Sequence, residues 1–245
     1  MPRSARKKSS TGIYHVMLRG VNRQPIFVDD EDNEKFLRIL TECKEASGFE
    51  LFAYCLMGNH VHLLLKEASE GLELIFRRIG SRYVRWFNWK YNRSGHLFQD
   101  RFRSEAVEND GYFVVALRYI HQNPVKAGIS ASIGAYKWSS YNDYVHKNGI
   151  VDHKFALSII GEAHFVAVMS EERNDSCMEL SGKRLNDDEL VNEISTRFRI
   201  EAIQIQDMPR DSMEDILRDI LKFEGVSTRQ LSRVTGVPVN TIWRL

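Results

Sequence analysis

The chain reads YCLMGNHVHLLL over residues 54–65, and this stretch decides how its first half folds. Apolar residues lie on both sides of the break Met57-Gly58-Asn59, which is typical of two β-strands joined by a hairpin. In the second strand His60 and His62 are two residues apart, so their side chains project from the same face of the sheet. Two imidazoles side by side on a strand can begin a divalent-metal site, but a bare His-x-His pair is more often one core and one surface histidine. The remaining residues of the chain have to distinguish a metal site from one core and one surface histidine.

The elements expected around the hairpin follow a recognisable order. Apolar spacing, acidic helix starts and turn residues predict the following elements: a strand at 12–19, a helix at 30–47, strands at 49–56 and 60–66, a helix at 70–92, a strand near 103–107 and a helix from about 110 to 122, closed by Asn123-Pro124. The order β-α-β-β-α-β is that of the ferredoxin-like split βαβ arrangement. We therefore expect an α+β fold with an antiparallel sheet and helices on one face. The other face is left for a ligand, and the histidine pair lies on a central strand.

Bulk composition narrows the class of protein. The chain has 245 residues, 43% of them hydrophobic, which fits one large domain or a main domain with an appendage. No apolar run approaches the ~18 residues of a membrane-spanning helix, and no apolar stretch follows the basic N-terminus as it would in a secretory signal. The three cysteines, Cys43, Cys55 and Cys177, are widely spaced and read as reduced thiols. We expect a cytoplasmic, nucleoid-associated protein without membrane contact.

Charge is unevenly distributed along the chain. Residues 1–150 hold 22 Lys and Arg against 16 Asp and Glu, whereas the remainder holds 12 against 17. The basic half is the half with the histidine pair, which favours a polyanionic partner.

The C-terminal part changes character after residue 147. Residues 148–209 are acidic and helix-prone, and Asp187-Asp188-Glu189 reads as a solvated helix start. Residues 210–245 predict three short helices, at 213–223, 227–234 and 238–245, with Ser227 as a cap and Gly236 in the last turn. This spacing is typical of a helix-turn-helix, although a small helical appendage would look similar. The predicted organisation is thus a domain at 1–147, an acidic helical extension at 148–209 and a helix-turn-helix-like domain at 210–245.

Five short motifs in this order carry a family resemblance. They are YHVMLRGVNR (14–23), MGNHVHLL (57–64), GHLFQDRFRS (95–104), LRYIHQNPVKAG (117–128) and WSSY (138–141). Together they resemble the single-tyrosine (Y1) HUH transposases, in the IS200-like branch associated with repetitive extragenic palindromes (REP). The resemblance covers roughly residues 12–145.

The resemblance implies a metal-dependent single-stranded DNA endonuclease and strand transferase that acts beside DNA hairpins. In the family a tyrosine attacks the scissile phosphate, leaving a 5′-phosphotyrosine link and a free 3′-OH, so that strands can be rejoined. A divalent ion, Mg²⁺ or Mn²⁺, would polarise the phosphate. Imidazole ligands favour Mn²⁺ of the two. The implied partner is single-stranded or hairpin DNA, with either a monomer or a homodimer as the active unit.

Residue roles follow from the matched motifs. Tyr119 holds the position of the family's nucleophile, and Asn123, four residues on along the same helix face, holds that of a third metal ligand beside His60 and His62. Tyr112, two turns earlier, is the main rival nucleophile, and His121 is a lesser ligand candidate.

Expected DNA contacts fall into three segments. The predicted helix at 70–92 interleaves arginines with aromatic residues, which suits phosphate contact and base stacking, although a solvated face would look alike. The matched loop motifs supply the others. The full set is Arg77, Arg78, Arg82 and Arg85; Gln99, Arg101 and Arg103; and Arg19, Asn22 and Arg23.

Two other functions stay open from the residues. A replication initiator or relaxase shares the histidine pair, but orders its motifs differently around the tyrosine. A catalytically inactive DNA-binding regulator would use the sheet and the helix-turn-helix for recognition alone.

Overall fold

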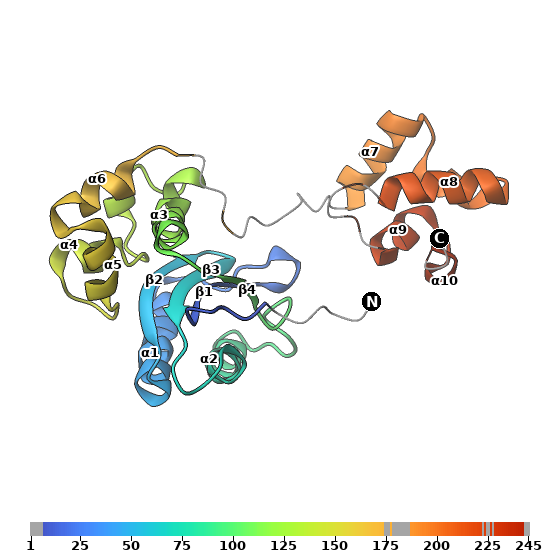
Figure 1. The fold of residues 1–245 in the computed structure, drawn as a ribbon. Coiled ribbons are helices and arrows are strands. Elements are labelled where there is room, and N and C mark those ends of the chain that lie inside the picture. Colours follow the sequence, from blue (N-terminus) through green and yellow to red (C-terminus); the bar gives the residue numbers. More distant parts are fainter. Residues whose placement is uncertain are drawn as a thin grey trace. The chain divides into compact units, whose positions relative to one another are not determined.

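The computed structural model describes residues 7–173, 177, 187–221, 223, 226 and 228–242. It divides into two compact units, Met1–Met178 and Glu179–Leu245. The elements in chain order are β1 Ile13–Arg19, η1 Val21–Arg23, α1 Asp30–Ser47, β2 Glu50–Met57, β3 His60–Lys66, α2 Leu72–Lys90, β4 Arg103–Ala106, α3 Asp110–Lys126, η2 Ile133–Ala135, α4 Tyr141–His146, α5 His153–Ile160, η3 Glu162–His164, α6 Phe165–Ser170, α7 Asp187–Phe198, η4 Ala202–Asp207, α8 Arg210–Leu221, α9 Thr228–Thr235 and α10 Val239–Ile242 (Figure 1).

The first unit is built on one antiparallel sheet with strand order β2-β3-β1-β4. This is the order of a split βαβ fold, so the predicted α+β class and ferredoxin-like sheet are confirmed. The tight turn at Gly58 and Asn59 joins β2 to β3, and β3 is a central strand, as expected. The histidine pair therefore lies on a strand that is hydrogen-bonded to a neighbouring strand on each side.

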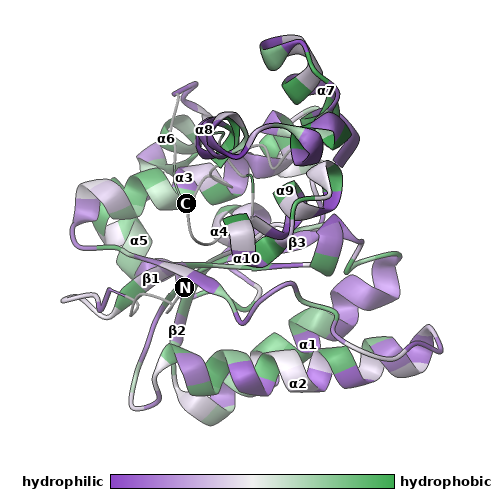
Figure 2. Cartoon of the chain, turned by 90° about the vertical axis from the view of Figure 1, so that its right-hand side faces the viewer, coloured by the Kyte–Doolittle hydropathy of each residue, from purple (hydrophilic) through white to green (hydrophobic). Residues whose placement is uncertain are grey.

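Helices cover both faces of the sheet. In Figure 1, α1 and α2 lie below the sheet, whereas α3 crosses above it. Polar and apolar positions alternate along α1 and α2 (Figure 2), because each helix buries one stripe against the strands. Asp29 caps α1 through a reciprocal bond with Asp32, as its acidic start predicted. The face expected to be free for a ligand is thus covered by α3, the helix that carries Tyr119.

Helix α3 is longer than predicted. The sequence Asn123-Pro124 was expected to end it near residue 122, but α3 runs through Pro124 to Lys126. Proline removes the backbone donor that would bond the carbonyl four residues earlier, and the helix ends two residues after Pro124. Pro124 is buried, and the side-chain amide of Asn123 donates to the backbone carbonyl of Tyr119 in the same turn.

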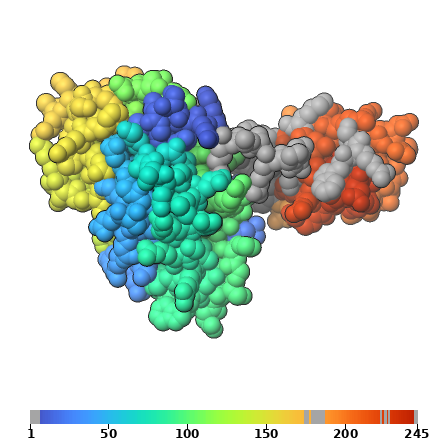
Figure 3. Space-filling view, turned by 60° about the horizontal axis from the view of Figure 1, so that its bottom comes forward, coloured from blue at the N-terminus to red at the C-terminus, as the bar shows by residue number. Residues whose placement is uncertain are grey.

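The segment after residue 147 begins inside the first unit. Phe165 and Met169 of α6 are buried in the same core as the sheet residues. The ring of Phe165 stacks on Tyr144, with centroids 4.6 Å apart. In Figure 3 the helices α4 to α6, in yellow, lie directly against the blue N-terminal elements. The expected middle segment, 148–209, is therefore divided between the two units.

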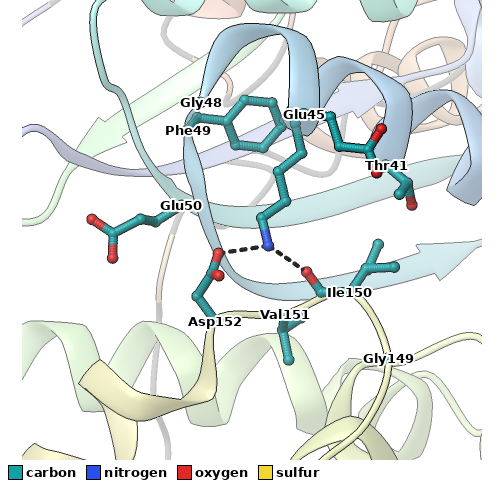
Figure 4. A pocket seen from close by; sticks show the side chains of 10 residues that line it. Thr41, Glu45, Gly48, Phe49, Glu50, Gly149, Ile150, Val151 and Asp152 are labelled. Carbon is teal, nitrogen blue, oxygen red and sulfur yellow. Dashed lines mark hydrogen bonds and ion pairs between the residues drawn. The ribbon is translucent and has the colours of Figure 1, made fainter.

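A pocket marks where this segment meets α1. The Nζ of Lys44 of α1 bonds the Asp152 carboxylate and the Ile150 carbonyl, both at 2.8 Å. Dashed lines in Figure 4 end at the labelled Asp152 and Ile150. These two bonds of Lys44 connect α1 to the loop at 149–152.

The second unit has its own small core. Buried residues from α7, η4, α8, α9 and α10 form it, among them Leu190, Leu217 and Leu231. Helices α9 and α10 are joined by a turn in which Gly236 has φ +75°, a left-handed conformation that favours glycine. Ser227 and Arg244 lie outside the described residues. The helix-turn-helix function of this unit stays a prediction. None of the helices described is long and apolar enough to span a bilayer.

Candidate active site on the covered face of the sheet

Strand pairing places one cationic and one apolar residue opposite the two histidines. His60 is in register with Arg19 of β1, and His62 is in register with Met17. Directly paired residues of antiparallel strands share a face, so Arg19, His60 and His62 all point toward α3. By the same alternation His15, two residues before Met17, also faces this helix.

Three histidine rings meet beneath α3. The ring centroids of His15 and His62 lie 5.1 Å apart, and those of His60 and His62 lie 5.0 Å apart. The ring of Tyr119 reaches down from α3 to within 5.8 Å of His15 and 5.7 Å of His62. Tyr119 is half-buried, whereas His15 and His62 are buried. Residues far apart in sequence thus form one compact group around the predicted nucleophile.

Both histidines of the pair have a hydrogen-bond partner at Nδ1. The Nδ1 of His60 lies 2.6 Å from Oδ1 of Asn59, and the Nδ1 of His62 lies 2.9 Å from Nε2 of His15. An imidazole whose Nδ1 donates a hydrogen bond keeps a lone pair on Nε2, which is the arrangement found in metal-ligating histidines. This geometry fits the two rings to the role of metal ligands.

Burial keeps these rings neutral. Desolvation lowers the pKa of His15 to about 3, and desolvation together with the nearby Arg19 charge lowers the pKa of His60 to about 4. The pKa of His62 is also lowered, by burial and then by its two histidine neighbours. Neutral imidazole is the form that binds metal ions.

Helix α3 brings two further groups to the site. Asn123 is one turn beyond Tyr119, and its Nδ2 bonds the Tyr119 carbonyl at 2.9 Å, which leaves the amide oxygen as a candidate ligand. The Nζ of Lys126 lies 5.5 Å from the centroid of the Tyr119 ring. Among the described residues no group of three or more His, Cys, Asp or Glu is arranged to hold a metal ion. An ion here would depend on the histidine pair and an oxygen ligand such as that of Asn123.

The two lesser candidates on α3 have partners of their own. Burial, and then a hydrogen bond with Glu105, raise the pKa of Tyr112. His121 is buried on another side of the helix, where its Nε2 lies 2.9 Å from the hydroxyl oxygen of Ser140. His121 therefore has a structural position on another side of the helix. The Glu105 partner of Tyr112, in contrast, is in register with His15 and shares the histidine face.

A tight loop beside the site holds Asn22 and Arg23. Both residues adopt left-handed backbone conformations, with φ values of 50° and 60°, which cost free energy in residues other than glycine. Asn59 holds the loop, because its Nδ2 donates to the Arg23 carbonyl and its own carbonyl accepts from the Gly20 amide. A Cβ atom on Gly20 would lie 2.2 Å from the Gln24 carbonyl oxygen, so the turn requires glycine there.

The motif at 95–104 is hydrogen-bonded to the end of β1 and to the loop that follows it. The amide of Gln99 donates to the Arg19 carbonyl, and Leu97 accepts from the Val21 amide. Arg103 of β4 is in register with Met17 and so shares the histidine face. Arg101 pairs with Glu73 at 3.4 Å. The candidate DNA contacts of the first and third motifs are therefore close together.

The arginines of α2 lie on the opposite face of the sheet from the histidines. Arg78 pairs with Glu70 at 2.7 Å, and Arg82 pairs with Glu42 at 2.9 Å. Arg77 and Arg85 are exposed. The structure thus places Arg19 and Arg103 on the histidine face and the arginines of α2 on the other face of the sheet.

Sequence reasoning missed two residues of the site. His15 lies inside the first motif, four residues before Arg19. Because alternate residues of a strand share a face, His15 and Arg19 could have been placed together on the strand that pairs with the histidine strand. Lys126 lies seven residues after Tyr119, and the helical spacing i, i+4, i+7 from Tyr119 through Asn123 would have found it.

Part of the chain is similar to known transposases. Residues 8–123 match the family model described as Transposase IS200 like. The chain is also similar to a Haemophilus influenzae protein that carries the name REP-associated tyrosine transposase. The two are 28% identical over 143 residues, which cover 54% of this chain and 80% of the relative.

A solved structure extends the likeness to the fold. The structure of a REP-associated tyrosine transposase bound to a REP hairpin superposes with a TM-score of 0.52 at 21% identity. The match covers 60% of this chain and 87% of that chain. The shared fold includes the four-stranded antiparallel sheet.

Proposed function

We propose that this chain is a metal-dependent endonuclease and strand transferase for single-stranded DNA, acting beside hairpins of repetitive palindromic elements. The observation that carries the proposal is the position of Tyr119, held by α3 against the histidine pair within the residues that match the IS200-like transposase model. The hairpin as partner is supported by the REP hairpin bound to the similar solved protein.

Tyr119 is the proposed nucleophile. Its hydroxyl oxygen attacks the scissile phosphorus, so that a bond from phosphorus to the tyrosine oxygen forms as the bond to the 3′ oxygen breaks. The phenol gives up its proton, and the departing 3′ oxygen takes one up to become a free 3′-OH. The DNA 5′ end stays attached to Tyr119, and attack by another 3′-OH reverses the step and joins the strands.

The surrounding residues bind and neutralise the phosphate. Arg19 on the histidine face and Lys126 beside the Tyr119 ring supply positive charge where the phosphate would lie. His60, His62 and the amide oxygen of Asn123 would hold the divalent ion, Mg²⁺ or Mn²⁺. When bound, that ion supplies Lewis-acid polarisation of the phosphate oxygen.

The second unit has a supporting role in this proposal. Helix α10 begins with Val239, Asn240 and Thr241, and asparagine suits contacts to adenine edges in duplex DNA. We assign the chemistry to the first unit and duplex binding to the second.

A covalent adduct tests the proposed reaction. A labelled hairpin oligonucleotide with a single-stranded flank is incubated with the protein and Mn²⁺, and adducts are separated on a denaturing gel. We expect an adduct with the wild type and with Tyr112→Phe, and none with Tyr119→Phe, which should still bind the hairpin. An adduct that persists in Tyr119→Phe and vanishes in Tyr112→Phe would assign the nucleophile to Tyr112. No adduct in any variant, with hairpin binding intact, would favour a DNA-binding regulator.

A further inference from the structure

Hydrogen bonding fixes which ring nitrogen carries the proton in His60 but not in His62. Asn59 can only accept at Oδ1, and its amide nitrogen is directed to the Arg23 carbonyl. The proton of His60 must therefore sit on Nδ1, where it is donated to Asn59. His62 instead faces another imidazole, His15, which can either accept or donate.

Only one of the two arrangements leaves His62 able to bind a cation. If Nε2 of His15 donates, then His62 carries its own proton on Nε2, and that atom has no lone pair for a metal ion. If Nδ1 of His62 donates, its Nε2 keeps the lone pair, and His15 carries its proton on Nδ1. The Nδ1 of His15 is buried and has no hydrogen-bond partner among the described residues. Metal binding therefore places a proton on a buried nitrogen of His15.

We propose that His15 is the positioning residue of His62: its Nε2 accepts the Nδ1 proton of His62 and holds the ring with Nε2 unprotonated for the metal ion. The inference rests on the metal site of the proposed function. His15 is fully buried, its Nε2 lies 2.9 Å from the Nδ1 of His62, and its ring packs at a 38° tilt against the ligand ring. Partners of this kind typically change metal affinity by about 10- to 100-fold.

Two variants separate the acceptor from the packing. His15→Gln keeps an acceptor oxygen at about the distance of Nε2, whereas His15→Leu keeps buried volume without any acceptor. We expect His15→Leu to weaken Zn²⁺ binding, measured by calorimetry, by about 10- to 100-fold, and His15→Gln to restore most of that loss. His121→Leu is the matched control, because it removes another buried histidine of the same unit. It should leave Zn²⁺ affinity unchanged even where thermal melting shows a comparable loss of stability.

Nitrogen-15 NMR of the histidine rings gives a readout that does not depend on activity. Zn²⁺ is the probe because it is diamagnetic and accepts imidazole ligands. In the full wild-type chain with Zn²⁺ we expect His62 to be protonated at Nδ1, with a scalar coupling across the hydrogen bond to Nε2 of His15. A His62 ring protonated at Nε2, or a folded His15→Leu chain with wild-type Zn²⁺ affinity, would overturn the role of His15 alone. A wild-type chain that binds no Zn²⁺ through its histidines would overturn the metal site of the proposed function together with it.

Discussion

Asn59 connects the ring of His60 to the backbone of Arg23. Its Oδ1 lies 2.6 Å from the His60 Nδ1, and its Nδ2 lies 3.3 Å from the Arg23 carbonyl oxygen. One side chain thus orients a candidate metal ligand and also supports the left-handed loop that carries candidate DNA contacts.

Replacing Asn59 tests this double role. We expect Asn59→Ala to weaken Mn²⁺ binding by about 10- to 100-fold, because the His60 ring loses the acceptor that fixes its tautomer. Calorimetry in the absence of DNA measures the effect. Asn142→Ala is the control, since Asn142 also donates to a backbone carbonyl, that of Gly134, but lies on α4. Equal Mn²⁺ affinities in the two variants would show that Asn59 does not orient the ligand.

The position of Arg19 predicts an effect on cleavage. Arg19 shares the histidine face, so Arg19→Ala should slow cleavage at saturating DNA by about 100- to 1,000-fold, as for the loss of one group that stabilises transition-state charge. Arg85 is exposed on α2, on the other face of the sheet. Single-turnover assays should therefore find a cleavage rate near that of the wild type in Arg85→Ala. A larger loss in Arg85→Ala than in Arg19→Ala would place the scissile strand on the α2 face.

Buried His121 predicts that stability falls in acid. Burial lowers its pKa to about 3, from an ordinary value of 6.5. The unfolded ring takes up a proton below about pH 6.5 while the folded ring stays neutral. The contribution of neutral His121 to the free energy of unfolding is therefore complete above that pH, and it is lost progressively as the pH falls toward 3. When the pH falls from 7 to 5, protonation linked to this histidine should lower the free energy of unfolding by about 2 kcal/mol.

Urea unfolding at pH 7 and pH 5 measures this loss. His121→Gln cannot take up the proton, so its free energy of unfolding should decline less over the same range. If the wild type and the variant lose equal stability between pH 7 and pH 5, the acid sensitivity comes from other groups.

The C-terminal boundary of the catalytic part can be tested with two truncations. A chain ending at residue 147 lacks Phe165 and Met169, which are buried in the first core. Because large core side chains are worth about 3–5 kcal/mol each, it should lose its cooperative thermal transition in circular dichroism. A chain ending at residue 173 keeps α6 and should melt cooperatively.

The longer of these two truncated chains also separates the roles of the two units. The chain ending at residue 173 should form the covalent adduct with single-stranded DNA, with weaker binding to the hairpin if the second unit reads duplex. If this chain is folded and binds metal but does not cleave at any DNA concentration, the second unit takes part in the active site.

The local parts of this protein follow from its sequence alone. Period-2 and helical spacing predicted the order of strands and helices, because side-chain direction repeats within each element. The same local rule put His60 and His62 on one face, and put Asn123 one turn from Tyr119. The family motifs added the roles of these residues, which spacing alone left open.

What lies across from these residues depends on how the elements pack in three dimensions. Strand β1 pairs with β3, which brings His15 against His62, and α3 crosses the same face, which brings Tyr119 down to both rings. Such contacts depend on which strands become neighbours and on where a helix packs, and neither is encoded in spacing along one element. The extent of the first unit is decided in the same way, because α6 is buried there by packing against elements far from it in the sequence.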